Sequence, residues 1–111
     1  MQMPTNSKLL IDLFPELSLE LEQLLFEQGE SDLARQVSRL PIVDRCRCED
    51  DFCGMFYVLP KPNGPYGRGH RNVCLSPKQG MLILDVVEER IAAVEVLYRD
   101  EIRHRLAIEF P

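Results

Sequence analysis

The stretch "MLILDVVEERIAAVEVLY", residues 81–98, predicts a β-hairpin at the centre of a sheet. A three-residue turn, Glu88 to Arg90, makes one face of the hairpin wholly apolar. Its facing pairs are Leu82 with Val96, Leu84 with Val94, and Val86 with Ala92. A two-residue turn would instead place Leu82 opposite Glu95 and mix the two faces. The other face is also largely apolar, which indicates strands with partial cover on both sides.

The remaining pattern predicts an α+β fold, with N-terminal helices packed on a mainly antiparallel sheet of about five strands and a short C-terminal helix. Apolar residues recur with helical spacing over about 7–40, and the period changes to two over about 41–98. We expect strands near 42–48, 54–59, 72–75, 81–87 and 91–98, and a closing helix over about 100–108. The expected organisation is a single domain over residues 1–111.

The composition limits the classes of partner and compartment. The 111 residues include 18 acidic and 13 basic side chains, a net charge of -5 that repels nucleic acid. No apolar run is long enough to span a membrane, and the N-terminus has no secretory pattern. We therefore expect a cytoplasmic protein, a monomer or small homo-oligomer, whose partner is another protein.

The segment "CRCEDDFC", residues 46–53, brings three cysteines close together in the chain. A hairpin here would place Cys48 across from Cys53 and all three thiols on one face. The favoured interpretation is that Cys46, Cys48 and Cys53 are small buried side chains without metal. A redox site is a weaker hypothesis, because neighbouring carboxylates oppose thiolate formation.

The alternative for this segment is a zinc site, with Cys74 or His70 as the fourth ligand. Against it, two cysteines in C-x-C spacing on a strand hold their thiols ~6.6 Å apart, which is too far for one ion. The expectation is therefore no cofactor, with zinc as the alternative.

A second candidate site is the loop "PKPNGPYGRGHRN", residues 60–72, which is rich in proline, glycine and basic side chains. We expect Tyr66 to anchor the loop and Arg68, His70 and Arg71 to form a basic edge. This edge could bind an acidic ligand or partner. In the competing interpretation, the arginines pair with sheet carboxylates such as Asp85 or Glu95.

Catalytic signals are sparse. His70 and His104 are the only histidines, and His104 falls in the closing helix, where a surface role is expected. Asp85 and Glu95 share a sheet face and could do acid–base work, but solvated or salt-bridged carboxylates are commoner. We therefore lean against an enzyme.

The motifs "DRCRCEDDFC", "YGRGHRNV", "GMLILDVV" and "VEVLYRDEIR" resemble those of a family of small uncharacterised bacterial proteins. The resemblance implies a bacterial origin and a single domain, and it carries over no catalytic residue. The main functional hypothesis is a non-catalytic interaction or regulatory protein. The alternatives are a small-ligand-binding or enzymatic module using the 60–72 loop, and a zinc-binding module.

Overall fold

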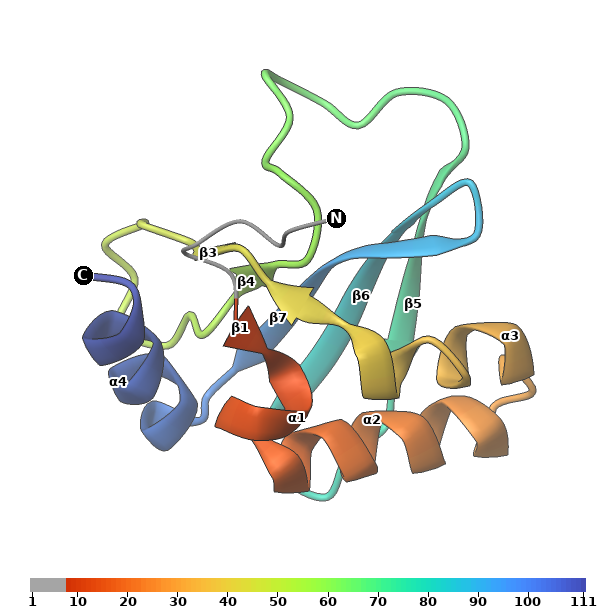
Figure 1. Cartoon of the computed structure of the whole chain (residues 1–111), viewed down its shortest axis with the longest axis horizontal. Helices are drawn as coiled ribbons and strands as arrows, with labels where there is room; N and C mark the ends of the chain where they lie inside the picture. Colours follow the sequence, from red (N-terminus) through yellow and green to blue (C-terminus); the bar gives the residue numbers. More distant parts are fainter. Residues whose placement is uncertain (1–7) are drawn as a thin grey trace.

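The computed structural model describes residues 8–111 and shows an α+β fold, as the sequence predicts (Figure 1). The elements follow in the order β1 (Lys8–Leu9), α1 (Leu10–Leu13), α2 (Pro15–Glu27), α3 (Ser31–Ala34), the 3-10 helix η1 (Val37–Arg39), β2 (Pro41–Ile42), β3 (Asp44–Arg45), β4 (Phe56–Tyr57), β5 (His70–Leu75), β6 (Met81–Val87), β7 (Arg90–Leu97) and α4 (Asp100–Glu109).

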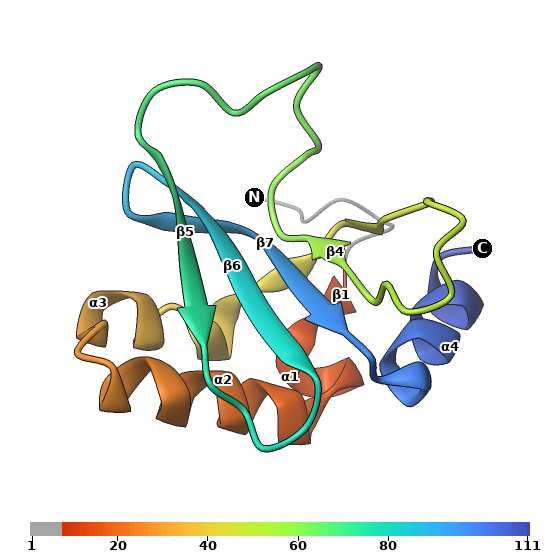
Figure 2. The same cartoon turned by 180° about the vertical axis from the view of Figure 1, so that it is seen from behind.

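Strands β3 to β7 form one antiparallel five-stranded sheet in the order β3-β4-β7-β6-β5, and β1 pairs with β2 apart from it. Helices α1, α2 and α3 lie together on one side of this sheet (Figures 1 and 2). Figure 2 shows the other face of β5, β6 and β7 without a helix over it, and we call this the open face. Helix α4 lies at the opposite end of the molecule from α3.

The central hairpin has the predicted pairing away from its turn. Leu82 pairs with Val96 and Leu84 with Val94. The predicted turn is wrong, because Val87 pairs with Arg90 and leaves only Glu88 and Glu89 in the turn, at φ 49° and 62°. Positive φ at both central residues is the backbone of a type I′ hairpin turn.

A β-bulge reconciles the short turn with the apolar face. The register shifts between Asp85 and Val86, so Val86 faces Ile91 rather than Ala92. The extra residue on β7 is Ala92, which is buried. A bulge of this kind adds one residue to one strand and so keeps apolar residues on the helix side of the sheet beyond the shift.

The core lies between the sheet and the N-terminal helices. Leu82, Leu84, Val94 and Val96 are fully buried in one cluster with apolar residues of α2, as expected. Helix α2 contributes Leu17, Leu21 and Leu25 at helical spacing. Pro15 stands in its first turn, and Gly29 follows its end at φ 83°.

Other predicted boundaries shift by a few residues. The expected strands 42–48 and 54–59 are the short elements β2, β3 and β4, and β5 begins at His70 rather than at 72. Residue 7, where the helical part was expected to begin, lies outside the described residues. Among residues 8–111, no helix combines the length and the apolar character that crossing a bilayer requires.

Replacing Val94 with aspartate should unfold the protein. Val94 is fully inaccessible, and an unpaired carboxylate there should cost more than about 4 kcal/mol. Urea denaturation followed by circular dichroism checks this, with Arg90→Asp at the exposed end of the same strand as control. A Val94→Asp protein with a cooperative transition near that of the control would contradict the core assignment.

Candidate metal centre

The segment that carries the cysteines is held by backbone hydrogen bonds to two neighbours. The Cys46 N–H donates to the Met55 carbonyl at 2.9 Å, which continues the pairing of β3 with β4. The Gly54 N–H donates to the carbonyl of Val96 in β7 at 2.7 Å, and Cys53 forms an isolated bridge with Leu97. Residues 46–55 are therefore fixed by β7 although they form no regular strand.

Gly54 permits this close approach. A Cβ atom at this position would lie 2.9 Å from the Val96 carbonyl oxygen, closer than side-chain carbons come to backbone oxygens. The glycine directly after Cys53 therefore lets the segment lie against β7. This is a packing reason for the sequence Cys53-Gly54.

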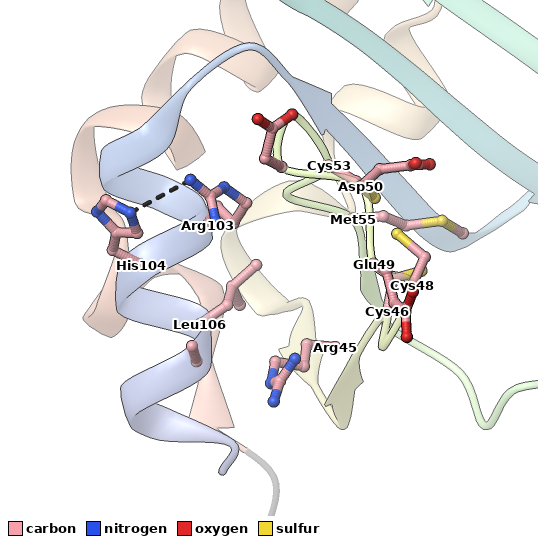
Figure 3. A pocket seen from close by; sticks show the side chains of 12 residues that line it. Arg45, Cys46, Cys48, Glu49, Asp50, Cys53, Met55, Arg103, His104 and Leu106 are labelled. Atoms are coloured by element: carbon pink, nitrogen blue, oxygen red, sulfur yellow. Dashed lines mark hydrogen bonds between the residues drawn. The ribbon is translucent and has the colours of Figure 1, made fainter.

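The three thiols gather at one point on the open-face side of the segment. The sulfur atoms of Cys46, Cys48 and Cys53 all lie within 4.8 Å of one another. Figure 3 shows the three side chains together, in a pocket that residues of α4 also line. The expected C-x-C separation of ~6.6 Å is therefore wrong, because it assumed an extended strand and β3 ends at Arg45.

The expected burial of the thiols is also wrong. Cys46 and Cys53 are half-buried and Cys48 is exposed. The expected pairing of Cys48 with Cys53 is wrong, because Cys48 forms no backbone bridge, while Cys53 is bridged to Leu97. The predicted gathering of the thiols on one face is confirmed.

The thiols differ in their readiness to lose a proton. A hydrogen bond from the Asp50 backbone N–H lowers the pKa of Cys48, and contacts with the Cys53 and Cys46 thiols lower it further against the opposing effect of burial. Burial raises the pKa of Cys53 to about 12, although the Met55 backbone N–H also donates to its sulfur. Cys48 is thus the first thiolate of the cluster.

The hydrogen bonds to the sulfurs of Cys48 and Cys53 have the same spacing along the chain. Each of the two sulfurs accepts an N–H from the residue two places further along the chain, Asp50 for Cys48 and Met55 for Cys53. Backbone N–H groups that point at sulfur stabilise negative charge on it. The sequence alone does not reveal these backbone donors, because the fold of residues 46–55 sets their positions and side-chain type does not.

The basic residues near the cluster lie on its helix side. Figure 3 shows Arg45 and Arg103 between the cysteine segment and α4, and His104 of α4 lines the same pocket. Arg45 donates to the Phe110 carbonyl at 2.6 Å, which ties the segment to the end of α4. His104 is exposed, as expected, and does not join the thiols.

The two residues expected as a fourth ligand lie elsewhere. Cys74 is exposed on β5, the edge strand at the opposite end of the sheet from β3. His70 Nε2 donates to Asp85 Oδ1 at 2.9 Å. Within residues 8–111, the close cluster consists of three thiols and includes neither of these residues.

A polar network occupies the open face near β5. Asp85 is buried and accepts hydrogen bonds from His70 and Asn72, and the Tyr66 ring packs on His70 with 4.8 Å between centroids. Burial raises the pKa of Glu95, and the adjacent Asp85 carboxylate raises it further. Asp85 and Glu95 thus meet as expected, inside a network of internal hydrogen bonds.

The expected basic edge of the 60–72 loop is divided between two faces of the sheet. Tyr66 is half-buried and anchors the loop, and Arg68 is exposed. Arg71 points to the helix side and pairs with Glu30 at 2.8 Å and Glu89 at 2.9 Å. Its partners are therefore neither Asp85 nor Glu95, because β5 begins at His70 and alternation sends Arg71 to the opposite face.

No protein-family model, curated protein or solved structure matches this chain. The resemblance to a bacterial family therefore stays a hypothesis.

The cysteines should react with iodoacetamide in a fixed order as pH rises. The thiolate is the reacting form, so Cys48 should be modified at lower pH than an ordinary cysteine and Cys53 last. Mass spectrometry of proteolytic fragments after timed labelling measures this order. Faster labelling of Cys53 than of Cys48 at neutral pH would contradict the assigned electrostatics.

Arg71→Ala should lower stability, whereas Arg68→Ala should not. Arg71 makes a two-bond contact with Glu30, so its loss should cost about 1 kcal/mol, or roughly 4–8 °C in Tm, after allowance for its partial exposure. Thermal melts of the two single variants provide the comparison. Equal melting temperatures for both variants would show that the Arg71 pairs are not structural.

Proposed function

We propose that the protein binds a zinc ion through Cys46, Cys48 and Cys53. The observation that carries the proposal is the mutual approach of their three sulfur atoms to within 4.8 Å. Thiolate is a preferred ligand of zinc and of other soft metal ions.

The sulfur positions need little adjustment to hold an ion. Zinc–sulfur bonds of ~2.3 Å at tetrahedral angles place sulfurs ~3.8 Å apart. Closing the widest gap therefore needs about 1 Å of movement, a distance that small side-chain rotations supply. Cys48 is exposed and has the most freedom to adjust.

The surroundings of the cluster favour a cation. The backbone N–H of Asp50 lowers the pKa of Cys48, and the backbone N–H of Met55 partly opposes the effect of burial on the pKa of Cys53. Glu49, Asp50 and Asp51 lie within the same turn and attract positive ions. Because a bound cation replaces thiol protons, zinc affinity should fall as pH is lowered.

Three protein ligands leave the fourth position of a tetrahedral ion for water or an outside group. This differs from a closed structural site made of four cysteines. The 111-residue chain is also long enough to build a core without metal, so zinc need not be required for folding.

In this proposal the protein is a non-catalytic binding protein of the bacterial cytoplasm, where thiols stay reduced and free to bind metal. We propose that the zinc-bound form regulates another protein by binding to it. The 60–72 loop is less favoured as a ligand site, since His70 and Arg71 already have internal partners.

The test is zinc titration of the reduced full-length protein, followed by gel filtration and elemental analysis. We expect one zinc per chain, and substantial loss of binding in Cys46→Ser, Cys48→Ser and Cys53→Ser proteins.

Cys74→Ser is the matched control, because Cys74 is an exposed cysteine outside the cluster. It should bind zinc like the unaltered protein. Zinc retained by a triple variant at positions 46, 48 and 53, or lost equally from the Cys74→Ser protein, would refute the proposal.

A further inference from the structure

An exposed aromatic pair stands beside the cysteine cluster. The rings of Phe52 and Tyr98 stack with centroids 5.3 Å apart and planes inclined by 23°. Their residues are 36% and 59% exposed, although large aromatic side chains stabilise a fold mainly when buried. Burial in the core therefore does not account for two aromatic rings at this place on the surface.

The backbone holds this pair at a conformational cost. Tyr98 has φ 63°, in the left-handed region that tyrosine rarely adopts. Its N–H donates to the Phe52 carbonyl at 2.9 Å, which fixes the two residues to each other. Strain at an exposed aromatic residue, held by a specific hydrogen bond, is a feature typical of functional surfaces.

Carboxylates flank both rings along the chain. Glu49, Asp50 and Asp51 precede Phe52, and Asp100 and Glu101 follow Tyr98 closely; all five are exposed. Within residues 8–111, only Asp100 of these forms an ion pair, a 3.5 Å contact with Arg103.

The nearest cation in sequence does not neutralise this charge. Arg99 is buried and donates to both carboxylate oxygens of Glu20 at 2.7 Å and to the Gln79 carbonyl. The positive charge of Arg99 is thus paired with Glu20 of α2. The ring pair therefore lies beside these carboxylates, and the nearby cations Arg45 and Arg103 line the pocket between the cysteine segment and α4.

We propose that Phe52, Tyr98 and the flanking carboxylates bind a lysine- and arginine-rich segment of a partner protein. A cation is attracted to the face of an aromatic ring, and neighbouring carboxylates attract the remaining positive charges of such a segment. An apolar partner would have to desolvate these carboxylates, and a nucleic acid would be repelled by them. The surface includes none of the three cysteine side chains, although its carboxylates Glu49, Asp50 and Asp51 lie in the same turn as the thiols.

The experiment measures binding of fluorescent oligolysine and oligoarginine peptides to the full-length protein by anisotropy at physiological ionic strength. We expect binding of both peptides and none of an oligoglutamate peptide. The ring variant is Phe52→Ala with Tyr98→Gly, since glycine accepts the positive φ and keeps the backbone unstrained. It should lose about tenfold in affinity, from two cation–aromatic contacts of ordinary strength.

A pair of charge variants separates this surface from general attraction to an acidic protein. Glu49→Gln, Asp50→Asn and Asp51→Asn together should weaken peptide binding. The matched control, Asp12→Asn, Glu16→Gln and Glu27→Gln, removes the same charge from exposed positions on α1 and α2 and should leave binding nearly unchanged.

Three outcomes would overturn the proposal. The first is equal weakening by the two charge variants, which would mean attraction to net charge alone. The second is unchanged binding by a folded ring variant. The third is self-association through Phe52 and Tyr98 that excludes the peptides, which would make a second copy of the chain the occupant.

Discussion

Strand β7 is hydrogen-bonded along both of its edges, and the core and the cysteine cluster both depend on its position. On one edge it pairs with β6, and on the other it pairs with β4 and continues to Gly54. Burial of Val94 and Val96 fixes which way its side chains face. A one-residue slip of β7 would therefore expose the core and also move Leu97, the bridge partner of Cys53. The free energy that stabilises the apolar core thus also holds the thiols together.

The open face links the cluster to the polar network through Tyr57. The strand pairings align Asp44, Tyr57, Ala93, Asp85 and Asn72 in one row across five strands. Burial raises the pKa of Tyr57, and negative charge on Cys46 and Cys53 raises it further, followed by that on Asp85 and Asp44. Negative charge on the thiols therefore raises the pKa of Tyr57, and a cation bound to the sulfurs would oppose this rise. An ion bound by the proposed site would in this way alter the electrostatics of the open face.

The sequence could predict those features that depend on local alternation, including the fold class, the core face of the central hairpin and the gathering of three thiols. It could not predict the bulge, because Ile91 and Ala92 are both apolar and either one can face the core. The C-x-C spacing was misleading for a similar reason, since it alternates like a strand while contacts with distant Val96 and Leu97 bend the segment. Arg71 was assigned to the loop because the strand was expected to begin at residue 72, two residues after the observed start of β5 at His70.

X-ray absorption at the zinc edge of the zinc-loaded protein tests the central claim most directly, because it counts the sulfur atoms bound to the ion. The proposed site predicts three sulfur ligands at ~2.3 Å and one lighter oxygen or nitrogen ligand at a shorter distance. A first shell made only of oxygen and nitrogen would contradict the assignment of the ion to Cys46, Cys48 and Cys53. A shell of four sulfurs would contradict the open fourth position that the geometry of the cluster implies.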